Sequence, residues 1–164
     1  MFYTLSSWPG WMVPLVVGYV AFLIGISVYD VRRHRIPNVA VYPAILVALG
    51  VAFVRPDGEW WTFVLSGFGA AGFFILLGSA GGGAMGGGDA KLAALIGLVA
   101  GFPAVLIALF VAFALGAVAG LLLIAIGRLG RRDPLPFAPA LAVGAATAAL
   151  AGRQLAGLFW PGVA

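Results

Sequence analysis

Long apolar runs separated by short polar segments dominate the pattern of this chain. Apolar residues fill the ranges 11–29, 39–54, 60–77 and 137–151, and a longer run extends from 90 to 127. A membrane-spanning helix needs about 20 predominantly apolar residues, because the hydrocarbon core of a bilayer is roughly 30 Å thick. The pattern therefore predicts an all-α integral membrane protein, with most of its charged residues in the connections.

The run from 90 to 127 is too long for one crossing. Its 38 residues would form a helix about 57 Å long at about 1.5 Å per residue. Gly101-Phe102-Pro103 lies within the run, and proline is favoured in the first turn of a new helix. Dividing the run there gives a single domain, 1–164, with a bundle of about six transmembrane helices. The predicted spans are 11–29, 39–54, 60–77, 89–102, 103–127 and 137–151.

Composition supports lipid as the surroundings of the chain. Apolar residues make up 63% and charged residues only 9%, against about 25% charged residues in a soluble domain, and mean hydropathy is +1.14. These values exclude a disordered chain, a coiled coil and an ordinary soluble enzyme. With no cysteine and a single histidine, a disulfide framework, a thiol nucleophile and zinc sites built from cysteine are excluded. The net charge of +4 does not lead us to expect a nucleic-acid partner, because in a membrane protein the location of the charges matters more.

The basic residues indicate the orientation of the predicted bundle. The first, third and fifth connections carry all but two of them, namely Arg32, Arg33, Arg35, Lys91, Arg128, Arg131 and Arg132, whereas Arg55 and Arg153 lie on the other side. Cytoplasmic loops are enriched in lysine and arginine, so both termini are expected outside. The five tryptophans would then all lie at the outer interface, where indole rings are favoured; they are Trp8, Trp11, Trp60, Trp61 and Trp160.

Two carboxylates stand apart from the solvated charges. Asp30 ends the first predicted span, and Asp89 follows three glycines and opens the fourth. A carboxylate at membrane depth costs about 2.5–3.5 kcal/mol on insertion scales, so each is a candidate functional residue. Because the chain crosses the membrane twice between them, both are expected on the cytoplasmic side at similar depth, where a compact bundle could bring them together.

Paired carboxylates suit peptide hydrolysis. Two like charges close together in a low dielectric cannot both ionise, so the pair shares a proton. The ionised member can take a proton from water and the protonated member can polarise a carbonyl, without a metal or cofactor. Structural roles remain open at this point: Asp30 could cap the next segment or pair with neighbouring arginines, and Asp89 could be the N-cap of the fourth span.

The glycines have a structural interpretation. The range 81–86 fits G-x-G-x-x-G, but no strand precedes it and no acidic residue follows about 20 residues later, which excludes a dinucleotide site. We expect irregular backbone over 78–88 at membrane depth, which is tolerated only in a protein interior or beside a wet cavity. Gly116 and Gly120 form a close-packing motif, expected to make contacts within the bundle.

Three segments together resemble the type IV prepilin peptidases, a family of G-x-G-D aspartic proteases. Asp30-Val-Arg-Arg-His-Arg-Ile36-Pro37-Asn38 resembles its D-x-x-x-x-x-I-P-N segment. Gly86-Gly-Gly88-Asp89-Ala-Lys91-Leu92 resembles its G-x-G-D-x-K-L segment. Pro136-Phe137-Ala-Pro139-Ala-Leu141 resembles its late P-F-x-P-x-L segment. The three occur in order, and the resemblance covers about residues 11 to 152.

The resemblance implies a multi-pass aspartic endopeptidase of the bacterial inner membrane. Asp30 and Asp89 would be the catalytic pair that cleaves, at the cytoplasmic face, the leader of a pilin-like precursor with its apolar helix. Pro37 would keep Ile36 extended and stop a helix there, and Lys91 is a motif position without an assigned chemical role. The remaining motif positions are Asn38, Gly86, Gly88, Pro136, Phe137 and Pro139. The resemblance implies neither a cofactor nor a metal.

Departures from the larger family members suggest a subgroup. Those members carry a cytoplasmic insert, often with Cys-x-x-Cys pairs, and also N-methylate the new pilin N-terminus. This chain has nine residues from Asp30 to Asn38 and no cysteine. It is therefore similar to the short, peptidase-only form found with tight-adherence (Flp-type) pili, for which we expect no methylation.

Two rival functions remain on the sequence alone. A small proton- or cation-coupled transporter could use Asp30 and Asp89 as its ion site, although the chain shows no obvious internal repeat and both residues lie at one face. A non-catalytic assembly subunit could use the same residues for capping and pairing. Substitution of either aspartate by asparagine separates these possibilities from a peptidase.

Overall fold

The computed structural model describes residues 10, 12–54, 59–80, 86–128, 130, 133 and 135–159, with the backbone alone for 12 and 151–159. Six helices and no strand occur within these ranges. The helices are α1 (Met12–Arg33), α2 (Asn38–Val54), α3 (Trp60–Ala80), α4 (Gly87–Ala100), α5 (Ala104–Ala125) and α6 (Ala138–Phe159). The predicted all-α class is confirmed.

The division of the long apolar run is also confirmed. Gly101 is the C-cap of α4, and Pro103 is the N-cap of α5. The φ of 68° at Gly101 is a conformation that glycine adopts without the steric cost of a side chain. A β-carbon at this position would also lie 2.7 Å from Phe63 Cε1. Backbone conformation and packing therefore both separate the two helices at this point.

Helix lengths support some membrane crossings more strongly than others. Three helical ranges are long and apolar enough to cross a bilayer, namely Val13–Arg33, Trp60–Ala80 and Ala104–Ala125. Asn38–Val54 and Ala138–Leu150 are shorter apolar helices, and α4 has 14 residues. The described residues thus contain three candidate spans, and a total of six crossings stays a prediction.

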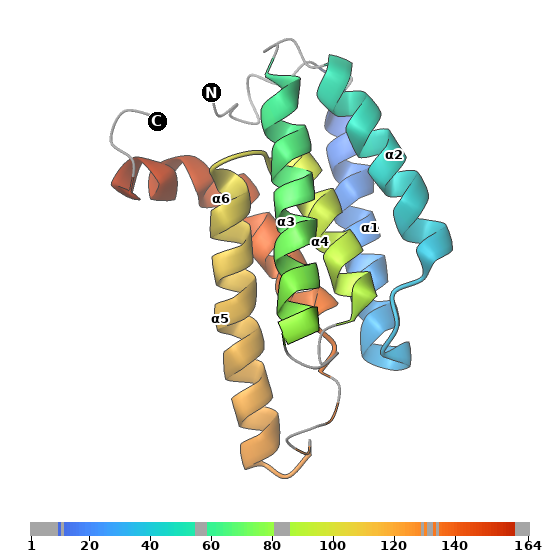
Figure 1. The fold of residues 1–164 in the computed structure, drawn as a ribbon, viewed down its shortest axis with the longest axis vertical. Helices are drawn as coiled ribbons and strands as arrows, with labels where there is room; N and C mark the ends of the chain where they lie inside the picture. The colour runs from blue at the N-terminus through green and yellow to red at the C-terminus, as the bar shows by residue number, and fades with distance from the viewer. Residues whose placement is uncertain are drawn as a thin grey trace.

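Successive helices run in alternating directions (Figure 1). The end of α1, the start of α4 and the start of α6 consequently lie at one end of the bundle, near the bottom of the view. Trp60 and Trp61 begin α3 at the opposite end, and both are exposed. The other charged and aromatic residues used to predict sidedness include some outside the described residues, namely Trp8, Trp11, Arg55, Arg131, Arg132 and Trp160.

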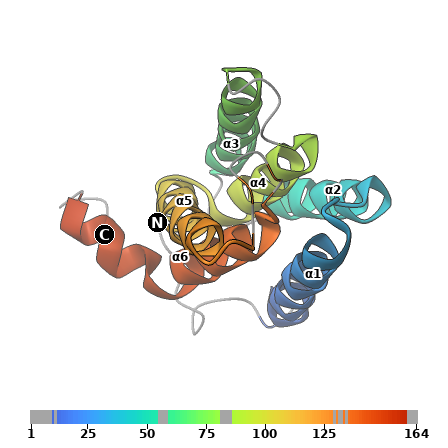
Figure 2. The same ribbon diagram turned by 90° about the horizontal axis from the view of Figure 1, so that it is seen from below.

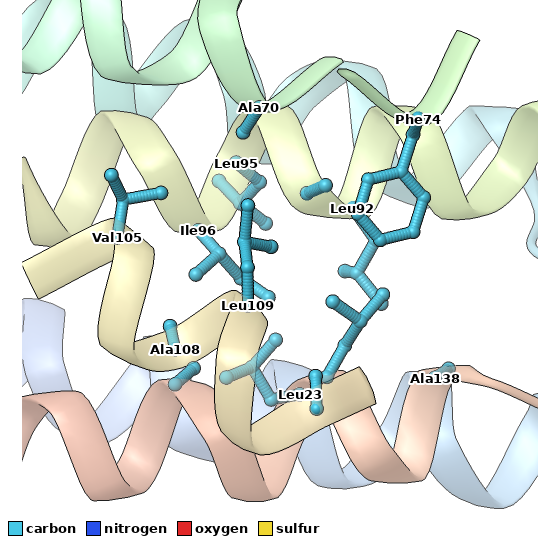
Figure 3. Close-up of a cluster of buried hydrophobic side chains, with 14 of the residues drawn as sticks. Leu23, Ala70, Phe74, Leu92, Leu95, Ile96, Val105, Ala108, Leu109 and Ala138 are labelled. Atoms are coloured by element: carbon cyan, nitrogen blue, oxygen red, sulfur yellow. The ribbon is translucent and has the colours of Figure 1, made fainter. Parts of the chain in front are cut away.

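The short helix α4 lies in the middle of the bundle (Figure 2), where it contacts α2, α3, α5 and α6. Its buried positions occur on all sides of the helix: Ala90, Leu92, Ala93, Leu95, Ile96, Gly97 and Leu98. Figure 3 shows the core that results, in which Leu92 and Leu95 of α4 meet Phe74 of α3 and Leu109 of α5. Because its neighbours surround α4, the position of Asp89 at its start depends on the whole bundle.

Close helix contacts occur where residues are small. A β-carbon on Gly97 of α4 would lie 2.8 Å from the Cα of Gly67 in α3. Between α5 and the connection that leads into α6, a β-carbon on Gly116 would collide with the ring of Phe137, and one on Gly120 would lie 3.5 Å from Leu135. The expectation that Gly116 and Gly120 make contacts within the bundle is therefore confirmed.

The glycine-rich stretch is more regular at its ends than expected. Residues 78–80 belong to α3, and α4 already begins at Gly87. The prediction of irregular backbone over the whole of 78–88 is therefore wrong at both ends, because the two helices continue into the glycines. Its centre, 81–85, lies outside the described residues.

Candidate active site

Asp30 belongs to the buried face of α1. Leu23, Ile26 and Asp30 have exposed fractions of 4%, 4% and 5%, and their spacing of three and four residues places them on one side of a helix. The Asp30 Oδ2 accepts a hydrogen bond from the backbone N–H of Ala138 over 3.1 Å. A carboxylate buried at this depth thus has a donor from the first residue of α6.

The structure corrects the expected place of Asp30 in its helix. The residue does not end α1, which continues to Arg33, and the backbone carbonyl of Asp30 accepts a hydrogen bond from the N–H of His34 over 2.7 Å. The carboxylate therefore does not cap the following segment. Arg32 and Arg35 are exposed, whereas the carboxylate is directed into the bundle toward α6.

Asp89 lies in the first turn of α4 and is half-buried. Gly86 is the N-cap, so the proposed capping role of Asp89 is wrong, because the helix begins three residues earlier than a cap at Asp89 would require. The backbone of Gly86 donates a hydrogen bond to the Asp89 carboxyl group, as an acidic residue in the third helical position often accepts from the N-cap.

The fold brings the two aspartates together. The negative charge of Asp30 acts electrostatically on the carboxyl group of Asp89, although two predicted spans separate them in sequence. Asp30 comes from the end of α1 and Asp89 from the start of α4, at the same end of the bundle (Figure 1). The predicted juxtaposition therefore exists in the structure.

The segment after Asp30 packs directly against the start of α4. No helix passes through Ile36 and Pro37, as expected, and α2 begins at Asn38. Ile36 is 8% exposed, and a β-carbon on Gly88 would lie only 2.8 Å from its Cβ. A β-carbon on Gly87 would meet nothing within 4 Å. Of these two glycines, only Gly88 is required by a close contact.

Lys91 connects the first two motifs by a polar contact. Its Nζ donates a hydrogen bond to the Asn38 Oδ1 over 2.7 Å and lies 4.9 Å from the centre of the Tyr42 ring. The sequence placed Lys91 in a motif and at the interface, but it did not indicate these partners. Tyr42 was not identified from the sequence, since an aromatic residue in an apolar helix carries no distinctive signal.

The third motif reaches Asp30 through its backbone. Phe137 is 9% exposed, and its ring centre lies 5.9 Å from that of Phe74 and 5.3 Å from that of Phe113. This packing holds the chain just before Ala138, which is fully buried and donates to Asp30. Pro136 and Pro139 flank this region and are half-buried. Sequence reasoning missed Ala138, because a backbone N–H has no residue-specific signal.

The model of the type IV leader peptidase family matches residues 17–121. The chain belongs to this family. The matched range includes Asp30 and Asp89, whereas the third motif lies beyond it. A similar protein is the prepilin leader peptidase/N-methyltransferase of Bacillus subtilis (strain 168), which is 35% identical over 144 residues, or 87% of this chain. The chain spans 57% of the length of that protein. No solved structure matches.

Family membership bears on the choice between a peptidase, a transporter and an assembly subunit. It agrees with the resemblance of the three motifs, and it gives no support to the transporter. The descriptions of the family and of the Bacillus protein both refer to a leader peptidase.

Proposed function

We propose that this chain is a membrane aspartic endopeptidase that removes the leader peptide of pilin-like precursors. Asp30 and Asp89 are its catalytic pair. The observation that supports this proposal most directly is the approach of these two carboxyl groups at one end of the bundle, with Asp30 bound to the N–H of Ala138. Membership in the leader peptidase family agrees with it.

The chemistry requires one ionised and one protonated carboxyl group. The ionised member takes a proton from water, and the water oxygen forms a bond to the carbon of the scissile carbonyl. The protonated member donates to the carbonyl oxygen, which stabilises the tetrahedral intermediate. A proton then passes to the peptide nitrogen, the carbon–nitrogen bond breaks, and a carboxylic acid and an amine leave. The proton that reaches the nitrogen is the one taken from water, and a hydroxyl of the intermediate returns a proton to the pair. The pair therefore holds one proton before and after the reaction, as like charges at short distance favour.

Cleavage takes place at the cytoplasmic face in this proposal. The chain crosses the inner membrane of a bacterium six times with both termini outside, and the apolar helix of the precursor lies in the bilayer beside the bundle. Arg32, Arg33 and Arg35 support this orientation, because they lie near the same end of α1 as Asp30 and are exposed.

We place the protein in the Flp-type subgroup, without N-methylation of the product. The support is the short connection from Asp30 to Asn38, which has no insert with cysteine pairs. Mass spectrometry of the cleaved precursor tests this subgroup separately. An unmodified N-terminus is expected, and a methylated one produced by this chain alone would contradict the assignment.

Cleavage in membranes tests the catalytic pair. A Flp-type pilin precursor is co-expressed with the wild type, Asp30→Asn, Asp89→Asn or the control Asp133→Asn. Asp133 is an acidic residue outside the site, whose carboxylate accepts the N–H of Gly130 over 2.7 Å. The wild type and Asp133→Asn are expected to shorten the precursor. Each active-site variant should lose activity by roughly 10²–10⁴-fold, the usual range for a general acid or base.

The comparison is made at equal amounts of membrane-inserted protein. Cleavage by both Asp30→Asn and Asp89→Asn at the wild-type rate would disprove the two-aspartate mechanism. Absence of cleavage by the wild type across a panel of pilin-like precursors would contradict the proposed peptidase. Proton flux into vesicles that depends on either aspartate would instead support the transporter.

A further inference from the structure

The contact between Lys91 and Asn38 joins the two segments that contain the proposed catalytic pair. Lys91 follows Asp89 by two residues in α4, and Asn38 is the first residue of α2. We propose that Lys91 is a positioning residue, which sets the rotation of the first turn of α4 and thereby directs Asp89 toward Asp30. The inference rests on the proposed function, since it concerns the geometry of the same pair.

Helix periodicity explains how Lys91 acts on Asp89 without touching it. Residues three apart share a face of a helix, so Gly88 and Lys91 lie on the same side of α4. That side meets the end of the α1–α2 connection through Gly88 against Ile36, and the start of α2 through the hydrogen bond of 2.7 Å to Asn38. Asp89 is rotated by about 100° from Gly88, and it is therefore directed away from α2.

On this side, the first turn of α4 is held by the close approach of Gly88 to Ile36 and by the polar contact of Lys91. Gly87 and Gly88 have no side chains to pack, and glycine in a helix is less constrained than alanine. Lys91 supplies both a half-buried stem and a charged head that lies over the Tyr42 ring. Ala90 and Ala93, which are buried, lie on the opposite side of the helix in the core. Removal of the Lys91 contact leaves the α2 side of this turn without its polar anchor.

Kinetic analysis of four variants tests this role. Lys91→Met keeps an unbranched stem and removes the donor, Asn38→Leu removes the acceptor, and the double variant removes both. Lys91→Arg restores a charged donor. We expect kcat to fall about tenfold in each single variant with KM within about twofold, because a misplaced catalytic group affects chemistry and a shift of 1 Å can cost about 100-fold. The double variant should be no slower than the singles, and Lys91→Arg should recover part of the loss.

Several results would overturn the inference while the wild type still cleaves. Losses that multiply in the double variant would show that Lys91 and Asn38 act independently. A rise in KM at unchanged kcat would assign Lys91 to substrate binding. A loss of activity that follows the loss of folded protein would reduce Lys91 to a structural residue. Tyr42→Phe serves as a control with normal kcat, since the ring under the ammonium is retained.

A measurement without substrate separates this inference from the proposed function. The chain has no cysteine, so spin labels can be attached only at introduced ones, here Val39→Cys and Gly87→Cys, both at exposed positions. The distance distribution between the labels should broaden when Lys91→Met is added and narrow again with Lys91→Arg. An unchanged distribution would disprove positioning by Lys91, whatever the result of the cleavage assay.

Discussion

The surroundings of Asp30 and Asp89 differ in how each carboxyl group is held. Asp30 lies within the 22-residue helix α1, is 5% exposed and accepts the N–H of Ala138. Asp89 lies in the first turn of the 14-residue helix α4, is half-buried and follows glycines. Asp30 is thus held by a contact between helices that are far apart in the sequence, whereas Asp89 is held next to glycines, which have no side chains.

The two carboxyl groups therefore depend on different parts of the bundle for their positions. Asp30 depends on the packing of α6, because Phe137 and its aromatic neighbours hold the chain before Ala138. Asp89 depends on the close approach of Ile36 to Gly88, which a side chain would prevent. Changes near Asp30 should therefore act through α5 and α6, and changes near Asp89 should act through α2.

The largest effect is expected when each carboxylate is extended by one methylene. Asp30→Glu should reduce cleavage by about 100-fold or more, because the buried carboxylate would move by about 1 Å from its donor. Asp89→Glu should lose less, since a half-buried side chain has room to adjust. Initial rates on one precursor, at equal membrane levels, give the comparison. The opposite order of losses would refute the view that Asp30 is the more rigidly held residue.

A smaller effect is expected from a methyl group near Asp89. Gly88→Ala would place a Cβ 2.8 Å from that of Ile36, whereas Gly87→Ala has nothing within 4 Å. Overpacking costs about 1–3 kcal/mol, so Gly88→Ala should cleave roughly tenfold more slowly or worse. Gly87→Ala is the matched control and should be close to wild type. Equal rates for the two variants would mean that Ile36 does not constrain Asp89.

Removal of the donor to Asp30 should have a comparable or smaller effect. Ala138→Pro deletes the N–H, and proline is tolerated in the first helical position. A hydrogen bond to a charged group contributes about 1.5–3 kcal/mol, so cleavage should fall about tenfold. Ala138→Val adds a similar volume and keeps the N–H, which makes it the control in the same initial-rate assay. If valine and proline impair cleavage equally, volume and not the hydrogen bond is responsible.

The smallest effect on activity is expected at the α5–α6 contact. Gly116→Ala would collide with Phe137, whereas the Cβ of Gly120→Ala would lie at an ordinary 3.5 Å from Leu135. The first should lower the free energy of unfolding by about 1–3 kcal/mol, and the second should leave it unchanged or raise it slightly. Thermal unfolding in detergent measures both. A more stable Gly116→Ala would contradict the packing that supports Asp30.

Much of the helical framework was predictable from the sequence. Apolar runs predicted α1, α2, α3 and the separate α4 and α5 to within a few residues, because a chain in lipid must satisfy its backbone hydrogen bonds internally. Helix ends were less predictable. Residues such as Asp30 and Gly87 are compatible with a helix or a connection, and in the structure both are helical.

The candidate site was likewise only partly predictable from the sequence. The sequence by itself identified the two aspartates as candidate functional residues. An acidic residue next to an apolar run costs free energy at membrane depth and therefore stands out. The tertiary structure decided which groups surround them: the N–H of Ala138, the close contact of Gly88 with Ile36, and the bond from Lys91 to Asn38. These contacts depend on how helices far apart in the sequence pack together. A backbone amide or the lack of a side chain also leaves no local sequence pattern from which such a contact could be predicted.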